Sequence, residues 1–434
     1  MYFMEVTDMM HKSYPRFGED VYILNLKNGM RVHILPKEEP YYTTYVELSM
    51  PYGALDICFK HNHMTYQTQP GTAHFLEHKM FAMPNGEDAF QMFSKLGMDA
   101  NAMTSYNQTS YLFTVSDNLI DGLKHLLYMM DTPYFTEENV EQEKLIIYEE
   151  LKMYFDDPNV VMQNDLMLQM YHHHPIKHDI GGDLDAVSAI KTSDLKTVYQ
   201  SFYHPSNRLL VIAGKVDLKA LKAFFKDYDD QIRVAYTKPK TIYPKEPKKL
   251  VKKHVVQFKD LQMNKLMLGI KLHPKKMTPQ AQIKREMAMT MMLNMLLGAS
   301  STMYAQLLEQ KLINQSFFIA PTFEKKAENI IIFGESKNVF KLKKILVDLL
   351  AKDGLALLSE DAFTRYKKVY LGQFIYALNS LEHKAYLYGK YIHMKTSLFE
   401  SLDMLTEINY TDILEVYHEI NPKTIASLIY KKTK

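Results

Sequence analysis

Residues 71–81 read GTAHFLEHKMF and predict a helix over 71–83 with apolar side chains around most of its circumference. Successive residues of an α-helix are about 100° apart, so His74, Glu77 and His78 fall on one face. Two imidazoles four residues apart can bind one zinc ion, and a glutamate beside them can reach a water molecule at that ion. The stretch therefore predicts part of a zinc site. An H-x-x-E-H pattern also arises by chance in long helices.

A third ligand is needed for a catalytic zinc site, and residues 136–155 predict a second helix that offers one. Its expected inward stripe consists of Val140, Glu143, Ile147, Glu150 and Tyr154. A carboxylate that faces a core is costly unless it is paired or bound to a metal. A zinc ion opposite Glu143 and Glu150 would account for both, and a salt-bridged helix face is the alternative.

The order of the predicted elements, strands followed by helices in each half, indicates an α+β fold with two units of similar size. The first half predicts strands at 21–36 (a hairpin), 43–50, 98–116 and 208–214, and helices at 71–83, 88–96, 117–131, 136–155, 158–171, 185–191 and 193–202. The second half predicts strands at 255–260, 266–272 and 315–335, and helices at 278–297, 301–312, 338–351, 359–377 and 381–396. We expect an N-terminal zinc-binding domain over 1–225, a Pro- and Lys-rich linker over 226–254, and a C-terminal α+β domain over 255–434.

Composition limits the classes of function. The chain has 434 residues, a net charge of +2 and a single cysteine, Cys58. A nearly balanced charge gives no electrostatic reason to expect nucleic acid as a partner. The lone cysteine suits a reducing compartment, and the sequence contains neither a signal peptide nor a run of about 18 apolar residues. We expect a cytoplasmic protein without a membrane span.

The motifs HFLEH (74–78) and EKLIIYEE (143–150) resemble those of the pitrilysin or insulinase-like zinc peptidases, the inverzincins, whose signature is H-x-x-E-H. The resemblance implies that one Zn²⁺ per chain is held by His74, His78 and Glu150. It also implies that Glu77 is the general base and that Glu143 is a supporting acidic residue. The chain is most similar to short bacterial members of the family that carry one zinc site.

A second part of the resemblance concerns the substrate. The stretch GMDANAMTSYNQTSYLF (97–113) resembles the family's edge strand, in which Asn101 and Ala102 would align the substrate backbone. The family implies two ferredoxin-like α+β units per chain, forming half of a clamshell. The implied activity is that of a zinc metalloendopeptidase subunit acting on peptides or unfolded segments, and the processing of one specific peptide precursor is compatible with it.

One segment departs from the family pattern. Active clamshells carry an Arg and a Tyr opposite the zinc, and the matching stretch here, LLEQKLIN (307–314), has Leu308 and Asn314 at those positions. We therefore expect a heterodimer with a zinc-less homologous subunit that supplies the Arg/Tyr pair. The alternative is a non-catalytic peptide-binding or assembly subunit on the same scaffold.

Two other features have simpler interpretations. His172, His173 and His174 are consecutive, so on a helix they would point in three directions, and we expect a surface role at a helix end. Gly181 and Gly182 indicate a loop without the context of a phosphate-binding motif.

Overall fold

The computed structural model describes residues 9–229 and 235–433, and the chain forms two compact units. The first contains the described residues up to Leu151, then Asp179–Ile242 and Tyr376–Phe399, and the second contains Lys152–His178, Tyr243–Ile375 and the described residues from Glu400 on. The chain thus crosses between units five times. The predicted α+β class is confirmed, because each unit combines a sheet with helices.

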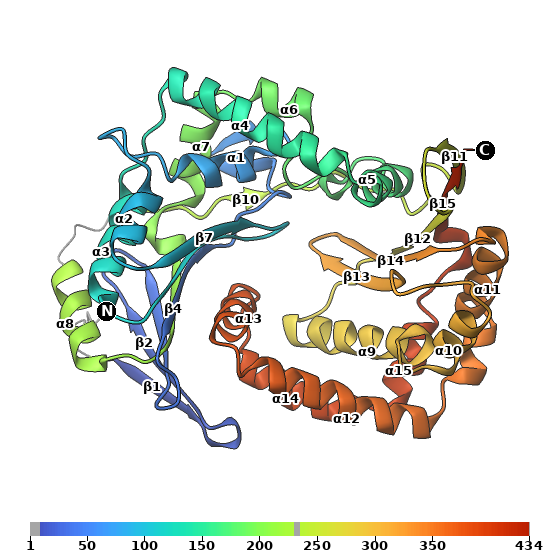
Figure 1. Ribbon diagram of the computed structural model, residues 1–434. Helices are drawn as coiled ribbons and strands as arrows, with labels where there is room; N and C mark the ends of the chain where they lie inside the picture. The colour runs from blue at the N-terminus through green and yellow to red at the C-terminus, as the bar shows by residue number, and fades with distance from the viewer. Residues whose placement is uncertain (1–8, 230–234, 434) are drawn as a thin grey trace. The chain divides into compact units, whose positions relative to one another are not determined.

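The first unit is built on a seven-stranded sheet in the order β1-β2-β3-β9-β4-β8-β7. Figure 1 labels four of these strands, β1, β2, β4 and β7. Every neighbouring pair is antiparallel except β3 and β9. A smaller sheet has the order β10-β5-β6. The strands are β1 (Met10–Tyr14), β2 (Glu19–Asn25), β3 (Arg31–Pro36), β4 (Thr44–Met50), β5 (Cys58–His61), β6 (Met64–Gln67), β7 (Asp99–Thr104), β8 (Thr109–Val115), β9 (Leu209–Gly214) and β10 (Lys240–Thr241).

The helices of the first unit meet its sheet at two places. One helix, α13, contacts β4 and β9, while α1 and α2 contact β7 and α3 contacts β8. These helices bring polar side chains as well as apolar ones to the sheet. The helices are α1 (Thr72–Lys79), α2 (Ala89–Lys95), α3 (Leu119–Asp131), α4 (Glu137–Phe155), α6 (Leu184–Ala189), α7 (Thr192–Phe202), α8 (Leu218–Tyr228) and α13 (Leu381–His393).

The second unit has a five-stranded sheet in the order β11-β15-β12-β14-β13, in which β11 and β15 are parallel. Helix α5 contacts β12 and β15, and α11 contacts the same two strands. The strands are β11 (His254–Lys259), β12 (Lys265–Leu272), β13 (Phe318–Glu324), β14 (Ala327–Glu335) and β15 (Ile425–Lys432). The helices are α5 (Pro158–Met170), α9 (Pro279–Leu297), α10 (Thr302–Glu309), α11 (Val339–Ala351), α12 (Glu360–Ala377), α14 (Leu398–Glu407) and α15 (Tyr410–Tyr417).

Most predicted elements are confirmed within a few residues, the hairpin at 21–36 among them. The first helix is shorter than predicted, because it ends at Lys79 instead of residue 83. The sequence did not predict β1, β5, β6, β15, α8, α14 or α15. Part of the predicted linker is ordered structure, since α8 enters it and β10 lies within it, and residues 230–234 of it lie outside the described residues. The predicted domain boundaries stay a prediction.

Over residues 9–229 and 235–433, no helix has the length and apolar character needed to cross a membrane.

Candidate metal centre

Helix α1 is positioned at its N-terminus by a close approach of two backbone segments. Gly71 precedes the helix with φ +87°, and a Cβ atom built there would lie 2.4 Å from the carbonyl oxygen of Gly181. Gly182, with φ +80°, would meet the Pro70 carbonyl oxygen at 2.7 Å in the same way. Glycine is the residue that tolerates both a left-handed conformation and such contact. The predicted loop at Gly181 and Gly182 thus packs against the start of α1.

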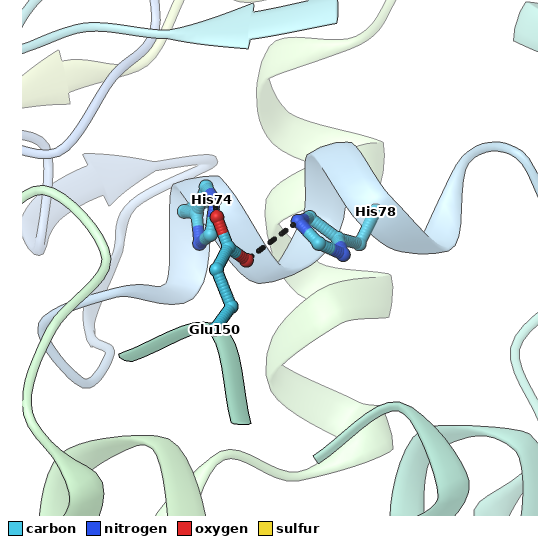
Figure 2. A group of neighbouring side chains, drawn as sticks. All are labelled: His74, His78 and Glu150. Atoms are coloured by element: carbon cyan, nitrogen blue, oxygen red, sulfur yellow. Dashed lines mark ion pairs between the residues drawn. The ribbon is translucent and has the colours of Figure 1, made fainter. Parts of the chain in front are cut away.

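Three potential ligands converge where α1 faces α4. The ligand atoms of His74, His78 and Glu150 all lie within 4.8 Å of one another. His74 Nε2 is 3.7 Å from Glu150 Oε1, and His78 Nε2 is 3.4 Å from Glu150 Oε2. Figure 2 shows the two imidazoles on one helix with the carboxylate reaching them from the other. The helical period therefore brings the histidines together, and α4 supplies the carboxylate.

This donor set fits a zinc ion. Two histidines and one glutamate form one of the ligand sets of catalytic zinc, and ligand bonds of about 2.0–2.2 Å place tetrahedral donor atoms about 3.3–3.6 Å apart. The two histidine–glutamate distances are close to that spacing.

Glu143 is not one of these three residues, but it contacts one of them, His78. Its Oε1 is 3.2 Å from His78 Nδ1, and its Oε2 is 3.3 Å from the Nζ of Lys79. The side chain of Lys79 is only 4 % exposed, so this ion pair is largely shielded from water. A carboxylate that accepts from the second imidazole nitrogen fixes the ring orientation and leaves Nε2 for a metal. Lys79 was not predicted, because its position beside the histidine gives no signal in the sequence.

The ionisable groups perturb one another. Burial lowers the pKa of His74, and the neighbouring His78 lowers it further. Burial also lowers the pKa of His78, but hydrogen bonds with Glu143 and Glu150 outweigh burial and raise this pKa to about 9. For Glu143, burial is outweighed by the hydrogen bond with His78 and by the charge of Lys79, so its pKa is lowered. The pocket of carboxylates therefore favours a positive charge between them.

Glu77 is buried on the same helix, and its carboxylate is held from β7. Thr104 Oγ1 donates a hydrogen bond to Glu77 Oε2. Burial raises the pKa of Glu77, and the Thr104 hydrogen bond opposes that rise. The sequence did not predict Thr104, although it lies in the stretch that resembles the edge strand. An adjacent general base with a raised pKa is a recurrent feature of hydrolytic sites.

Asn101 and Ala102 lie on β7, which is an edge strand of the seven-stranded sheet. They pair with Leu112 and Tyr111 of β8 on one side. Asn101 Oδ1 accepts a hydrogen bond from the N–H of Ala102 at 2.8 Å. An edge strand presents backbone groups that can pair with a further strand.

The other positions singled out in the sequence lie outside this cluster of potential ligands. Tyr154 is 47 % exposed, so its predicted place on the inward stripe of α4 is wrong, because the buried stripe continues through Leu151. The three histidines follow the end of α5 as predicted, but His174 is fully buried and the predicted surface role is wrong for it. Its Nε2 lies 3.0 Å from the Lys325 carbonyl oxygen. Asn314 donates to Glu335, and Leu308 is 44 % exposed on α10.

Two family models and one curated relative match most of the chain. Residues 62–183 match the family Insulinase (Peptidase family M16), and residues 189–370 match the Peptidase M16 inactive domain. The uncharacterized zinc protease YmfH of Bacillus subtilis is 33% identical over 416 residues, which cover 94% of this chain and 95% of YmfH.

Two solved structures share the fold over nearly the whole chain. An M16-like peptidase from Alicyclobacillus acidocaldarius has a TM-score of 0.91 and 25% identity, with coverage of 98% of this chain and 100% of that one. A protease from Helicobacter pylori has a TM-score of 0.80 and 20% identity, with coverage of 98% and 99%. The match over both halves, together with the identity to YmfH along the chain, shows that this protein belongs to the M16 (insulinase) family of peptidases.

Proposed function

We propose that this chain is the zinc-bearing subunit of a metalloendopeptidase that hydrolyses peptides or unfolded segments. The observation that carries the proposal is the convergence of His74, His78 and Glu150 with Glu77 buried beside them. One Zn²⁺ per chain would be held by the first three residues. Bound there, zinc supplies a Lewis acid that polarises a carbonyl group and acidifies a water molecule.

Proton transfer, ring orientation and substrate alignment are assigned to residues of the chain. Because Thr104 occupies Glu77 Oε2, the other carboxylate oxygen is left to take the proton of the attacking water. As the new C–O bond forms, the amide C–N bond breaks, and Glu77 returns the proton to the leaving amine. Glu143 and Lys79 keep the His78 ring in place during these steps. The substrate would lie extended along β7, where Asn101 and Ala102 align its backbone.

We further propose a heterodimer as the active form. Neither Leu308 nor Asn314 provides the cationic or phenolic group that the family resemblance expects opposite the zinc, and the Asn314 amide is engaged by Glu335. A zinc-less homologous subunit with an Arg/Tyr pair would complete the site. A non-catalytic peptide-binding subunit is the second candidate, favoured by the same two positions.

The experiment replaces Glu77 by Gln and measures zinc content and peptide cleavage, both for the purified chain and after co-purification with its partner from the source cell. We expect about one zinc per chain in both proteins and loss of at least about 100-fold in kcat for Glu77→Gln, as for removal of a general base. Undiminished turnover of the variant would contradict the assigned base. Zinc binding without cleavage of a peptide library, even with the partner present, would favour the non-catalytic candidate.

The purified chain alone tests the partner proposal. We expect weak or no cleavage by the single chain and a marked gain when the partner is added. Full activity of the single chain would contradict the heterodimer and leave the zinc assignment intact.

A further inference from the structure

The second unit contains a cavity of about 470 Å³ that the proposed peptidase chemistry does not use. It lies between the start of β11, helix α11 and the first residues of β15. Ile425 and Ser427, both buried on β15, form part of its lining, and Phe340 and Val347 of α11 add apolar surface. Cavities of roughly 300–1,000 Å³ with apolar walls and a few polar groups are typical of small-molecule sites.

The charged groups at this cavity are unbalanced. Lys253, Lys343 and Lys344 line it, against one carboxylate, Asp348. None of these three lysines makes an ion pair with a carboxylate in the parts of the chain that the structure describes. Asp348 Oδ1 already has a cationic neighbour, since it lies 3.7 Å from the Nζ of Lys352. Three positive charges around a partly enclosed volume create a potential that favours an anion.

His254 adds a hydrogen-bond donor to the lysines. Its Nδ1 lies 3.2 Å from the Nζ of Lys343 and 2.9 Å from the Oγ of Ser427. A lysine N–H can only donate, so Nδ1 is the acceptor and the ring proton is on Nε2. Among residues 9–229 and 235–433, no group accepts a hydrogen bond from that Nε2–H.

Repulsion between the basic groups at the cavity also favours a bound anion. Burial lowers the pKa of His254, and the charges of Lys343 and Lys253 lower it further. Burial and the charge of Lys253 also lower the pKa of Lys343. Lys253 and Lys343 therefore repel each other, and neither makes an ion pair with a carboxylate among the described residues. A bound anion would relieve that repulsion.

We propose that this cavity binds a small organic anion, with a carboxylate or phosphate group between Lys253, Lys343 and His254 and an apolar body against Phe340 and Val347. The lysines would make charge-assisted hydrogen bonds to the anionic oxygens. A body about the size of one aromatic ring suits the apolar part of the lining. Neither the proposed metal centre nor the family match assigns a ligand here.

Calorimetric titration of the full chain with four probes tests this proposal. Phenyl phosphate and phenylacetate carry the two candidate head groups on a ring, inorganic phosphate lacks the ring, and benzyl alcohol lacks the charge. We expect saturable binding of at least one aromatic anion at one per chain, about tenfold weaker binding of inorganic phosphate, and no binding of benzyl alcohol. The tighter of the two aromatic anions identifies the head group.

Variants localise the binding. Lys253→Gln and Lys343→Gln should each weaken binding of the aromatic anion about tenfold, the loss of affinity expected for one charge-assisted contact. Lys341→Gln is the matched control, because Lys341 lies on the same helix but contacts Gln310 and does not line the cavity. Phe340→Ala should remove most of the preference for phenyl phosphate over inorganic phosphate. The exposed or half-buried side chains of all four positions leave folding intact, which thermal unfolding verifies.

Two outcomes would overturn the proposal. The first is the absence of saturable binding by every anion up to about 10 mM. The second is equal weakening by Lys341→Gln and Lys343→Gln, which would mean that the anions bind through general surface charge.

Discussion

Glu143 illustrates how one carboxylate can serve two basic groups. One of its oxygens contacts His78 and the other contacts the almost completely buried Lys79. If either partner were absent, a carboxylate with 14 % side-chain exposure would be left with a partial desolvation cost. The pairing explains why an acidic residue is tolerated on the inward face of α4, and it leaves Glu150 as the carboxylate closest to both imidazole Nε2 atoms.

Thr104 is a positioning residue for the proposed base. Thr104→Val keeps the shape of the side chain but removes the O–H that donates to Glu77. We expect kcat for peptide cleavage to fall about tenfold, the usual scale for one lost hydrogen bond to a charged group, with zinc content and KM unchanged. Steady-state kinetics and metal analysis measure both quantities.

Thr104→Ser is the control for that variant, because it restores the hydroxyl. It should recover most of the lost kcat. If Ser were as impaired as Val, packing of the methyl group and not the hydrogen bond would be responsible. Unchanged kcat in the Val variant would exclude a role for the contact.

The buried carboxyl group of Glu47 should make the free energy of unfolding depend on pH. Its side chain is fully buried on β4, and its Oε1 accepts from Gln108 and Ser110. Burial raises its pKa from the ordinary 4.5 to about 7, even though those two hydrogen bonds act in the opposite direction. The folded protein therefore holds a proton that the unfolded chain releases. This contribution to the free energy of unfolding is complete below pH 4.5 and is lost as the pH rises through 7.

Glu47→Gln should remove that dependence, because the amide keeps the acceptor oxygen and cannot ionise. Chemical denaturation at several pH values should show the wild-type free energy of unfolding falling by up to a few kcal/mol between pH 4.5 and 8 relative to the variant. The exposed Glu138→Gln serves as a control and should follow the wild type. Parallel pH profiles for wild type and Glu47→Gln would show that Glu47 does not titrate in this range.

At the scale of single residues, the sequence predicts the contacts that follow a period. His74, Glu77 and His78 share a face because the helical period fixes their directions, and Glu150 follows from a stripe on one helix. Thr104 could not be predicted in this way. Its contact with Glu77 depends on how β7 lies against α1, and no local pattern in the sequence encodes that arrangement.

At the scale of elements, α1 depends on a turn that the helix pattern does not reveal. The helix begins without a side-chain cap, and Gly71 takes a left-handed conformation against the Gly181 carbonyl. The predicted extension to residue 83 fails because the chain turns after Lys79, where Ala82 forms a β-bridge with Asp88. The apolar composition of residues 80–83 reflects burial in this turn and not a further helical turn.

Gly71→Ala should therefore damage the metal centre from a distance of one helical turn. The new methyl group would meet the Gly181 oxygen at 2.4 Å and would require a left-handed alanine. We expect a loss of about 1–3 kcal/mol in the free energy of unfolding and weaker zinc retention, because the helix start must shift. Denaturant unfolding and metal titration measure these effects.

Gly86 provides a matched control, since it has φ +82° but open space around a built Cβ atom. Gly86→Ala tests the cost of the left-handed conformation alone and should leave zinc binding unchanged. Equal effects of the two substitutions on zinc binding would contradict the role of the contact with Gly181.

At the scale of the whole molecule, the two units exchange helices along the chain. Helix α5 belongs to the second unit although its sequence neighbours lie in the first, and α13 belongs to the first unit although its neighbours lie in the second. Periodicity predicts which face of such a helix is apolar, but it does not identify the sheet that the helix covers. The sequence therefore predicted both helices correctly and gave no sign of the exchange.

The exchanged helix α13 is joined to the first sheet by buried polar contacts. Tyr388 Oη lies 2.7 Å from His33 Nδ1, and His393 Nε2 lies 2.9 Å from Ser49 Oγ. Lys384 donates to Glu19 with its side chain fully buried. A buried polar group is costly when its partner is missing. Removing α13 would therefore destabilise the sheet more than removing a helix that contacts it through apolar side chains alone.

This dependence predicts the behaviour of the domain boundary that the sequence suggests. A fragment of residues 1–225 would lack α13 and would carry α5 without its sheet, which exposes Met162, Leu166 and Met170, each fully buried in the intact chain. Each of those side chains contributes about 1.5–3 kcal/mol when buried. We expect this fragment alone to show no cooperative thermal transition by circular dichroism, and co-expression with residues 226–434 to restore one, because each fragment then supplies the helix that the other lacks. A cooperative transition of the isolated fragment near that of the intact chain would show instead that residues 1–225 are an independent domain and that the exchanged helices are dispensable for its stability.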